Sequence, residues 1–181
     1  MKPAVFIERD GILNRLRIEG LTQVSPMTLN EFHLKKEVAP LLNELRAAGL
    51  ILVVTTNQPG LSRGCLARRE LDRMHEALKA TFAVHDLLVC PHEDSDRCLC
   101  RKPKPGLLLE AAHKWGLDLN RSFVISDKWQ DAEAGRRVGA TSMLVRSPWM
   151  GDVHHDFVLP DLSSLVEKVL QLNSRHSLAT A

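Results

Sequence analysis

The sequence predicts an α/β fold with a Rossmann-like parallel sheet that has helices on both faces. Short apolar runs typical of buried strands alternate along the chain with segments of helical periodicity. Polar residues follow several of these runs, and ligands of open parallel sheets bind beyond the carboxyl ends of the strands. The chain has 181 residues, 44% of them hydrophobic, which suits one domain with its own core.

Periodicity places the individual elements. The predicted strands cover residues 4–7, 50–54, 87–89, 122–125, 142–145 and 157–159. The predicted helices cover residues 38–48, 67–82, 106–115, a segment from the turn at 126–128 to about 138, and 162–172. Residues 12–36 lack periodicity and are expected to form an irregular excursion or flap, with no large cap domain. We expect the domain to cover residues 1–172, followed by a frayed tail at 173–181.

Charge and hydropathy exclude several classes of partner. The formal net charge is +2, which gives no general reason to expect nucleic acid or an anionic membrane as a partner. We see no apolar stretch long enough to span a bilayer and no signal-peptide pattern at the start. We therefore expect a cytoplasmic protein that is a monomer or a weak dimer.

Two pairs of carboxylates follow predicted strands. Glu8 and Asp10 come after the first strand, and Asp127 and Asp131 come after the fourth. Carboxylates that converge on one crevice repel each other, and a hard divalent cation such as Mg²⁺ relieves that repulsion. The alternative for each acid is an exposed position or a helix cap, and Asp127 would make a reasonable N-cap.

Neutral and basic groups suit a phosphoryl ligand in the same crevice. Thr56 and Asn57 follow the second strand, and their hydroxyl and amide groups suit phosphoryl oxygens or, alternatively, a simple turn. Lys102 precedes a helix expected to begin near Gly106, where free N–H groups and the helix dipole favour an anion. The alternative for Lys102 and for Lys128 is an ordinary solvated lysine.

Three cysteines and a histidine form a second cluster. Three thiolates and one imidazole suit tetrahedral zinc with no position open for chemistry, so a structural site is predicted within a loop over residues 90–101. Buried free thiols are the alternative, and that is what we expect for Cys65. A zinc ion here would fix the loop that delivers Arg101 and Lys102. The candidate ligands are Cys90, His92, Cys98 and Cys100.

The order of these motifs resembles that of phosphatases in the haloacid dehalogenase (HAD) superfamily. The stretches at 56–64, 100–106 and 127–131 are similar to those of D-glycero-D-manno-heptose 1,7-bisphosphate phosphatases and the related histidinol-phosphate phosphatases. The resemblance covers about residues 4–172 in order. It implies a HAD-like fold, structural Zn²⁺, and Mg²⁺-dependent hydrolysis of a phosphorylated sugar or a similar small metabolite, with the heptose bisphosphate favoured over histidinol phosphate.

The resemblance also implies roles for single residues. Glu8 stands at the nucleophile position, and Asp10 would protonate the leaving oxygen and then activate water. Glu8, Asp127 and the backbone carbonyl of Asp10 would bind Mg²⁺. Asp131 would orient Lys128 or the outer shell of the metal. Residues expected to hold the phosphoryl group or the rest of the substrate are Thr56, Asn57, Lys102, Arg63, Arg101 and Lys128.

Two departures from the family pattern bear on activity. The family motif begins with aspartate and ends in threonine, whereas this chain has Glu8 and Ile12 at those positions. The extra methylene displaces the attacking oxygen by up to about a bond length, and such an error can cost on the order of 10²-fold in rate. An enzyme is favoured, and the alternative is a pseudo-phosphatase that binds a phosphorylated ligand. A third alternative is that Glu8 replaces a native aspartate.

Overall fold

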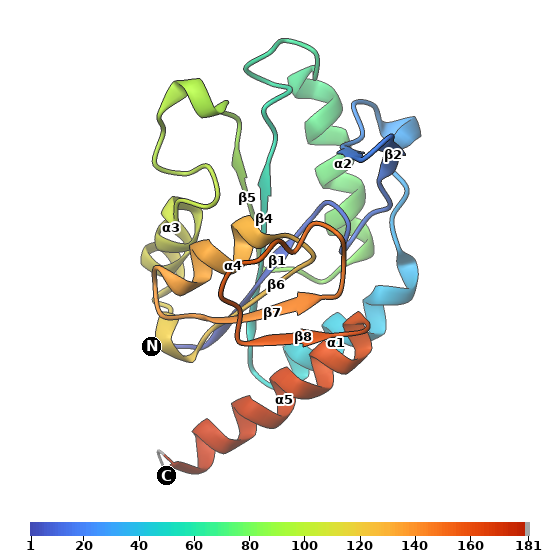
Figure 1. The fold of residues 1–181 in the computed structure, drawn as a ribbon. Helices are drawn as coiled ribbons and strands as arrows, with labels where there is room; N and C mark the ends of the chain where they lie inside the picture. Colours follow the sequence, from blue (N-terminus) through green and yellow to red (C-terminus); the bar gives the residue numbers. More distant parts are fainter. Residues whose placement is uncertain (180–181) are drawn as a thin grey trace.

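A computed structural model describes residues 1–179 and has a six-stranded parallel sheet at its centre (Figure 1). The strand order is β5-β4-β1-β6-β7-β8, and every neighbouring pair is parallel. The predicted α/β fold is confirmed, and each predicted strand is present. The strands are β1 (Ala4–Glu8), β4 (Ile51–Asn57), β5 (Asp86–Cys90), β6 (Phe123–Ser126), β7 (Thr141–Val145) and β8 (Phe157–Leu159).

Helices cover both faces of the sheet because successive strand residues point to opposite sides. Val5 and Ile7 of β1 join one apolar cluster with α1, α2 and α5, whereas Ala4 and Phe6 join another with α3. Gly135 of α4 lies against Val124 on this second face. The α-helices are α1 (Ala39–Ala47), α2 (Arg68–Thr81), α3 (Gly106–Trp115), α4 (Trp129–Arg136) and α5 (Leu162–Ala179). The short 3-10 helices are η1 (Leu29–Glu31), η2 (Lys36–Val38), η3 (Asp94–Asp96) and η4 (Leu119–Arg121).

The excursion after β1 contains an antiparallel hairpin that the sequence did not predict. It consists of β2 (Arg17–Glu19) and β3 (Thr22–Val24), joined at Gly20, whose φ of +60° suits a residue without a Cβ. All three residues of β2 are exposed, so no alternation of apolar and polar residues marked the strand. The hairpin, the loop after β4 and the cysteine loop after β5 lie at the same end of the molecule (Figure 1).

The prediction of a frayed tail is wrong for residues 173–179, because α5 continues to Ala179. Asn173 explains part of this extension, since its amide donates a hydrogen bond of 3.3 Å to the backbone oxygen of Ala48. That contact fixes the helix against the end of α1. Residues 180–181 of the expected tail lie outside the described part of the chain. Within residues 1–179, every helix is too short or too polar to cross a membrane.

Candidate active site

The acidic and basic residues predicted for the site converge at the carboxyl ends of β1, β4 and β6. Five of them are almost completely buried, with exposures of 1–7%: Glu8, Asp10, Lys102, Asp127 and Asp131. A cavity of about 190 Å³ opens beside all of them except Asp127, which lines a larger cavity of about 720 Å³ that also has Leu16 and Gln23 in its wall. Its lining residues are Glu8, Asp10, Leu16, Gln23, Ser25, Asn57, Pro59, Arg101, Lys102, Lys128, Gln130 and Asp131.

Lys102 is held between two carboxylates. Its ammonium group donates to Glu8 Oε2, to Asp131 Oδ1 at 2.6 Å and to the backbone oxygen of Thr55 at 3.3 Å. The other oxygen of Glu8, Oε1, accepts a hydrogen bond of 3.0 Å from the backbone N–H of Asp10. Both carboxylate oxygens of Glu8 are therefore engaged by groups that could also bind phosphoryl oxygens.

Burial and pairing shift the pKa values of this triad. Burial alone would raise the pKa of Glu8, but the charges of Lys102 and Lys128 bring it below its usual range. Burial would lower the pKa of Lys102, but Asp131 and Glu8 raise it. Burial raises the pKa of Asp131 to about 6 despite the opposing charge of Lys102. Asp131 contacts Lys102 through Oδ1, and no hydrogen bond joins it to Lys128 within residues 1–179, so its predicted role in the outer shell of the metal is the alternative that stays a prediction.

The carboxylate of Asp10 is held by four donors. Arg9 contacts it twice, through Nε at 2.9 Å and Nη2 at 3.1 Å. The hydroxyl of Ser25 and the amide of Gln58 both donate to Oδ2, at 2.8 and 2.9 Å. Burial would raise the pKa of Asp10, but Arg9 and the other donors hold it well below its usual range. Asp10 is therefore held as a carboxylate.

Arg9 is fully buried beneath the site, at 0% exposure. Besides Asp10, it donates through Nη1 to His75 Nε2 at 3.1 Å, and its guanidinium lies 5.3 Å from the centre of the Phe32 ring. An arginine has no acceptor, so this His75 nitrogen must be the unprotonated one. Burial, followed by the charge of Arg9, lowers the pKa of His75 to about 3, so the ring is neutral.

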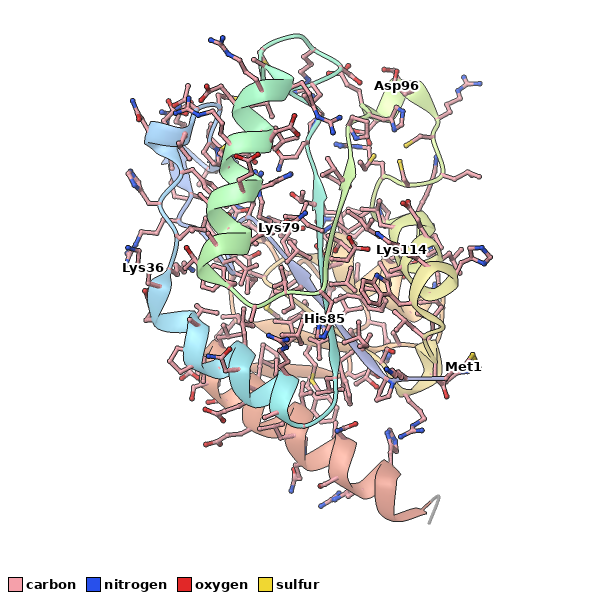
Figure 2. All side chains as sticks on the ribbon, turned by 180° about the vertical axis from the view of Figure 1, so that it is seen from behind. Met1, Lys36, Lys79, His85, Asp96 and Lys114 are labelled. Atoms are coloured by element: carbon pink, nitrogen blue, oxygen red, sulfur yellow. The ribbon has the colours of Figure 1, made fainter. Side chains whose placement is uncertain are left out.

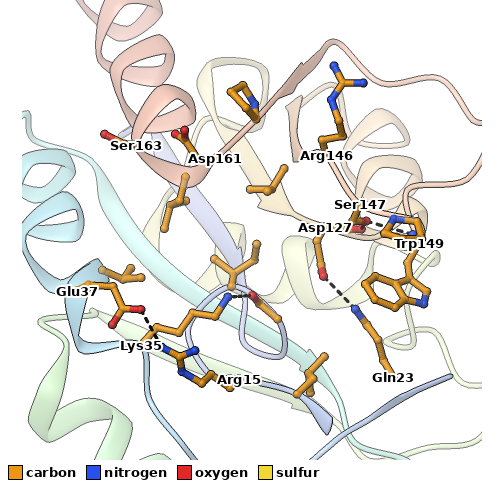
Figure 3. A pocket seen from close by; sticks show the side chains of 18 of the residues that line it. Arg15, Gln23, Lys35, Glu37, Asp127, Arg146, Ser147, Trp149, Asp161 and Ser163 are labelled. Carbon is orange, nitrogen blue, oxygen red and sulfur yellow. Dashed lines mark hydrogen bonds and ion pairs between the residues drawn. The ribbon is translucent and has the colours of Figure 1, made fainter. Parts of the chain in front are cut away.

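Asp127 offers a carboxylate suited to a cation. Its Oδ1 atom is buried without a hydrogen bond, while Oδ2 accepts one of 3.1 Å from Gln23 (Figure 3). A Cβ built on Gly11, in the turn after β1, would lie 2.6 Å from Asp127 Oδ2, so only glycine lets this turn and the carboxylate approach so closely. The ammonium of Lys128 donates to the Asp10 carbonyl oxygen and lies 3.5 Å from Asp127 Oδ1. These oxygens, with Glu8 nearby, fit a hard cation such as Mg²⁺.

The two residues predicted after β4 differ in their positions. Asn57 lines the cavity, and its side chain exchanges two hydrogen bonds of 3.2 Å with the backbone of Lys102. Thr56 is fully buried and is not among the lining residues; its hydroxyl accepts a hydrogen bond of 2.8 Å from Gln58. Because Gln58 also donates to Asp10, Thr56 is connected to the site through one intervening side chain.

Arg101 and Arg63, both predicted to bind substrate, are tied to the cysteine loop. Arg101 lines the cavity, but its guanidinium contacts Asp94 at 2.7 Å and the His92 carbonyl at 3.1 Å. Arg63 pairs with Glu93 of the same loop and is not among the residues that line the cavity. Ile12, where the family has threonine, is 4% exposed and packs into the apolar core.

The four cysteine-loop residues come together as the sequence predicts. Their candidate ligand atoms all lie within 4.8 Å of one another. Cys90 Sγ is 3.7 Å from Cys98 Sγ and 3.6 Å from His92 Nδ1, and Cys100 Sγ is 3.2 Å from that nitrogen. Tetrahedral zinc with bonds of about 2.3 Å would separate sulfur ligands by about 3.8 Å, so the set fits this metal. Cys65 lies outside the cluster and is exposed, which corrects the expectation of a buried thiol.

Several residues of the site were not predicted from the sequence. Ser25 and Gln23 come from the hairpin excursion, where no periodicity indicated that they would reach back to Asp10 and Asp127. Gln58 stands in the stretch at 56–64 that carries part of the family resemblance, and that resemblance could have indicated a role for it. Arg9 and His75 are 66 positions apart, so their contact has no local signature.

Comparisons with known proteins agree with this architecture. A family model described as HAD-hydrolase-like matches residues 99–165. The D-glycero-beta-D-manno-heptose-1,7-bisphosphate 7-phosphatase of Helicobacter pylori J99 is 33% identical over 153 residues, covering 80% of this chain and 84% of that protein. The protein of the same name from Yersinia pestis is 29% identical and covers 92% of this chain and 95% of its own.

A solved structure gives the same result for the fold. The D,D-heptose 1,7-bisphosphate phosphatase of B. bronchiseptica, complexed with magnesium and phosphate, matches with a TM-score of 0.80 at 26% identity. The match covers 93% of this chain and 98% of that chain. The predicted HAD-like fold is thereby confirmed. The identity to the Helicobacter protein over four-fifths of the chain shows the family as well. This chain belongs to the heptose bisphosphate phosphatase family of the HAD superfamily.

Proposed function

We propose that this protein is a Mg²⁺-dependent phosphatase that hydrolyses a phosphorylated sugar of the D-glycero-D-manno-heptose 1,7-bisphosphate type. The observation that carries the proposal is the convergence of Glu8, Asp10 and Lys102 on one small cavity, with Asp127 next to Lys128 at its edge. Phosphoryl transfer depends on positioning and on neutralising charge, and this set supplies a nucleophile, an acid–base group, a cation and metal ligands. The names of the relatives favour the heptose bisphosphate over histidinol phosphate.

The chemistry would proceed in two displacements. In the first, a carboxylate oxygen of Glu8 bonds to phosphorus while the bond from phosphorus to the sugar oxygen breaks, and that oxygen takes a proton that Asp10 has first acquired from solvent. In the second, water attacks phosphorus and gives a proton to Asp10. The Glu8–phosphorus bond then breaks, and inorganic phosphate and free Glu8 are released.

The surroundings of Asp10 favour the second displacement. Arg9, Ser25 and Gln58 all donate to its carboxylate, and the charged form is the one that takes a proton from water. Lys102 neutralises negative charge beside Glu8, and Asn57 fixes the backbone that carries Lys102. These contacts hold the acid–base group and the cation at fixed positions on either side of the nucleophile.

Two metals would have separate roles. Glu8, Asp127 and the carbonyl oxygen of Asp10 would hold Mg²⁺, which when bound neutralises charge on the phosphoryl group. The cysteine cluster would hold Zn²⁺ as a structural ion, with all four positions filled by protein. Zinc thiolates persist in a reducing compartment, which supports the expected cytoplasmic location. Arg101 and Lys128, which line the cavity, would contact the substrate beyond its phosphate.

A second candidate function is binding of a phosphorylated ligand with little turnover. The observation that favours it is the engagement of Glu8, whose two oxygens already accept from Lys102 and from the Asp10 N–H. A longer carboxylate in this position competes with a phosphoryl group for the same donors. In that state the protein would act as a pseudo-phosphatase.

An activity assay separates the two candidates. The purified protein with Mg²⁺ is assayed for phosphate release from the heptose bisphosphate, histidinol phosphate and an aryl phosphate. Turnover of ~1–10³ s⁻¹, abolished in Lys102→Met, is the result expected of a phosphatase. Phosphate binding without turnover favours the pseudo-phosphatase. Faster hydrolysis of histidinol phosphate than of the heptose bisphosphate would overturn the assignment of the substrate.

A further inference from the structure

A second hollow adjoins the phosphoryl cavity. It has a volume of about 400 Å³, and it shares Gln23, Lys128 and Gln130 with the smaller cavity around Glu8. The remaining residues that line it are Trp129, Pro148, Trp149 and Gly151. A ligand with its phosphate next to Glu8 would therefore reach the hollow past these three shared residues, and the hollow is large enough for a small ligand.

The aromatic wall of the hollow is fixed to the catalytic loop. The backbone N–H of Trp129 donates a hydrogen bond of 3.2 Å to the Trp149 carbonyl oxygen, which joins α4 to the loop after β7. The Ser147 hydroxyl donates to the Asp127 carbonyl and accepts a hydrogen bond of 3.1 Å from the Trp149 N–H. Figure 3, a close-up of the larger cavity that Asp127 lines, shows Trp149 close to Ser147 and Asp127.

Gly151 lets the loop after β7 pack closely on Trp129. Its φ of +65° is in the left-handed region, and a Cβ built on it would lie 3.1 Å from Trp129 Cβ and 3.3 Å from Trp129 Cγ. A larger residue would push the loop away from the indole. The backbone after Trp149 therefore packs directly on Trp129, and the two tryptophans keep a defined relative position.

Most polar groups of the hollow are uncharged, and three of them are available to a ligand. Within residues 1–179, neither the Trp129 nor the Trp149 indole N–H donates a hydrogen bond, and the amide of Gln130 has no partner. Lys128 is the one charged residue that lines the hollow, and its ammonium is already bound to the Asp10 carbonyl oxygen. A second phosphate would find no free cation here, whereas a neutral ring with hydroxyl groups would find flat apolar faces and several free donors.

We propose that Trp129 and Trp149 form a subsite for the sugar ring of the substrate, bound as a pyranose while its phosphate lies beside Glu8. The ring would lay its apolar face on indole and direct its hydroxyls to the indole N–H groups and to Gln130. This inference rests on the proposed function, because it assigns the neighbouring cavity to the phosphoryl group. It predicts selection for cyclic sugar phosphates over phosphate esters that lack a ring.

Binding of two non-hydrolysable probes tests the subsite. Calorimetry with Mg²⁺ compares the 6-phosphonate analogue of mannose 6-phosphate, which has a pyranose ring, with methylphosphonate, which has none. The intact protein is expected to bind the sugar phosphonate at least about tenfold more tightly than methylphosphonate. Trp149→Ala is expected to lose about tenfold in affinity for the sugar probe and to bind methylphosphonate unchanged. Trp149→Phe, which keeps an aromatic face, should recover most of that loss.

The third tryptophan supplies a matched control. Trp115 is at the end of α3, where its indole N–H donates to Asp86 at 2.9 Å, and it lines neither cavity. Trp115→Phe should leave both affinities unchanged. Equal loss for both probes in Trp149→Ala would overturn the subsite, as would unchanged binding of the sugar probe. Tighter binding of phenylphosphonate than of the sugar probe would overturn the assignment to a pyranose in favour of an aromatic ligand.

The same titrations separate failure of the subsite from failure of the proposed function. If the intact protein binds methylphosphonate but gains nothing from the sugar ring, the subsite is wrong and the phosphoryl site stands. If it binds neither probe and releases no phosphate from any ester, the proposed function fails, and the subsite inference fails with it.

Discussion

Lys102 and Glu8 form an ion pair in which the side chains are 1% and 5% exposed. Lys102 is on the segment that follows the cysteine loop, and Glu8 ends β1, so the pair connects the candidate zinc loop to the candidate nucleophile. Asp131 of α4 completes the group from the other side of Lys102. One buried ammonium thus compensates two buried carboxylates, which makes its removal costly.

Lys102→Met should destabilise the fold as well as abolish activity. The variant leaves Glu8 and Asp131 buried without their cation, and breaking such a buried pair costs about 3–5 kcal/mol of unfolding free energy. Urea unfolding without Mg²⁺ measures this loss. Lys79→Met is the matched control because Lys79 is exposed on α2 (Figure 2), and a change of no more than about 0.5 kcal/mol is expected there. A similarly small change in Lys102→Met would show that the pair contributes nothing to stability.

Glu8→Asp should raise the rate of phosphate release. The shorter side chain withdraws the carboxylate by about one bond length and leaves room for a phosphoryl group beside Lys102, so an increase on the order of 10²-fold in kcat is expected. Steady-state assays with Mg²⁺ measure it. Glu8→Gln keeps the length but removes the charge, and it should be inactive. If Glu8→Asp hydrolyses no faster than the natural chain, the length of the nucleophile does not limit this protein.

Acid should weaken the fold through His75. Its pKa falls from an ordinary 6.5 to about 3 in the folded protein, so between these values the unfolded chain binds the extra proton. The contribution of the neutral ring to the free energy of unfolding is therefore fully present above pH 6.5. It is lost as the pH falls toward 3, by up to about 1.4 kcal/mol per pH unit. Urea midpoints measured from pH 7 to pH 4 report the slope.

His75→Gln tests the assignment of that slope. Glutamine can still accept a hydrogen bond from Arg9 but does not titrate, so the decline with acid should become shallower. His113→Gln is the control, because His113 is exposed on α3 and its replacement should leave the slope as it is. Identical slopes in the natural chain and in His75→Gln would assign the acid sensitivity to other groups.

Loss of one cysteine ligand should remove zinc and slow catalysis at a distance. Cys98→Ser breaks the four-ligand set, so elemental analysis should find less than one zinc per chain, and kcat should fall because the loop no longer fixes Lys102. Hydrogen exchange over residues 90–102 should become faster. Cys65→Ser, outside the cluster, should retain zinc and activity. Full zinc content in Cys98→Ser would contradict the assignment of this ligand.

Local patterns in the sequence were enough to predict the helices and strands and the residues of the motifs. Strand and helix periodicity is set by neighbouring residues, so it indicated each strand of the central sheet and each of its covering helices. Parallel strands bring their carboxyl ends to one edge, which is why the sequence alone assigns Glu8, Asp127 and Lys102 to one site. The spacing from Cys90 to Cys100 similarly predicted the four-ligand cluster.

The tertiary structure decided which partners these residues have. Asp131 contacts Lys102 instead of orienting Lys128, because α4 turns its side chain toward the buried ammonium. Gln23 reaches Asp127 across 104 positions, and Asn173 extends α5 by bonding to Ala48 across 125. Contacts between such distant residues depend on how whole elements pack, whereas helix and strand periods depend on residues a few positions apart. The sequence by itself therefore determined the elements and the chemical groups, and the packing determined which groups meet.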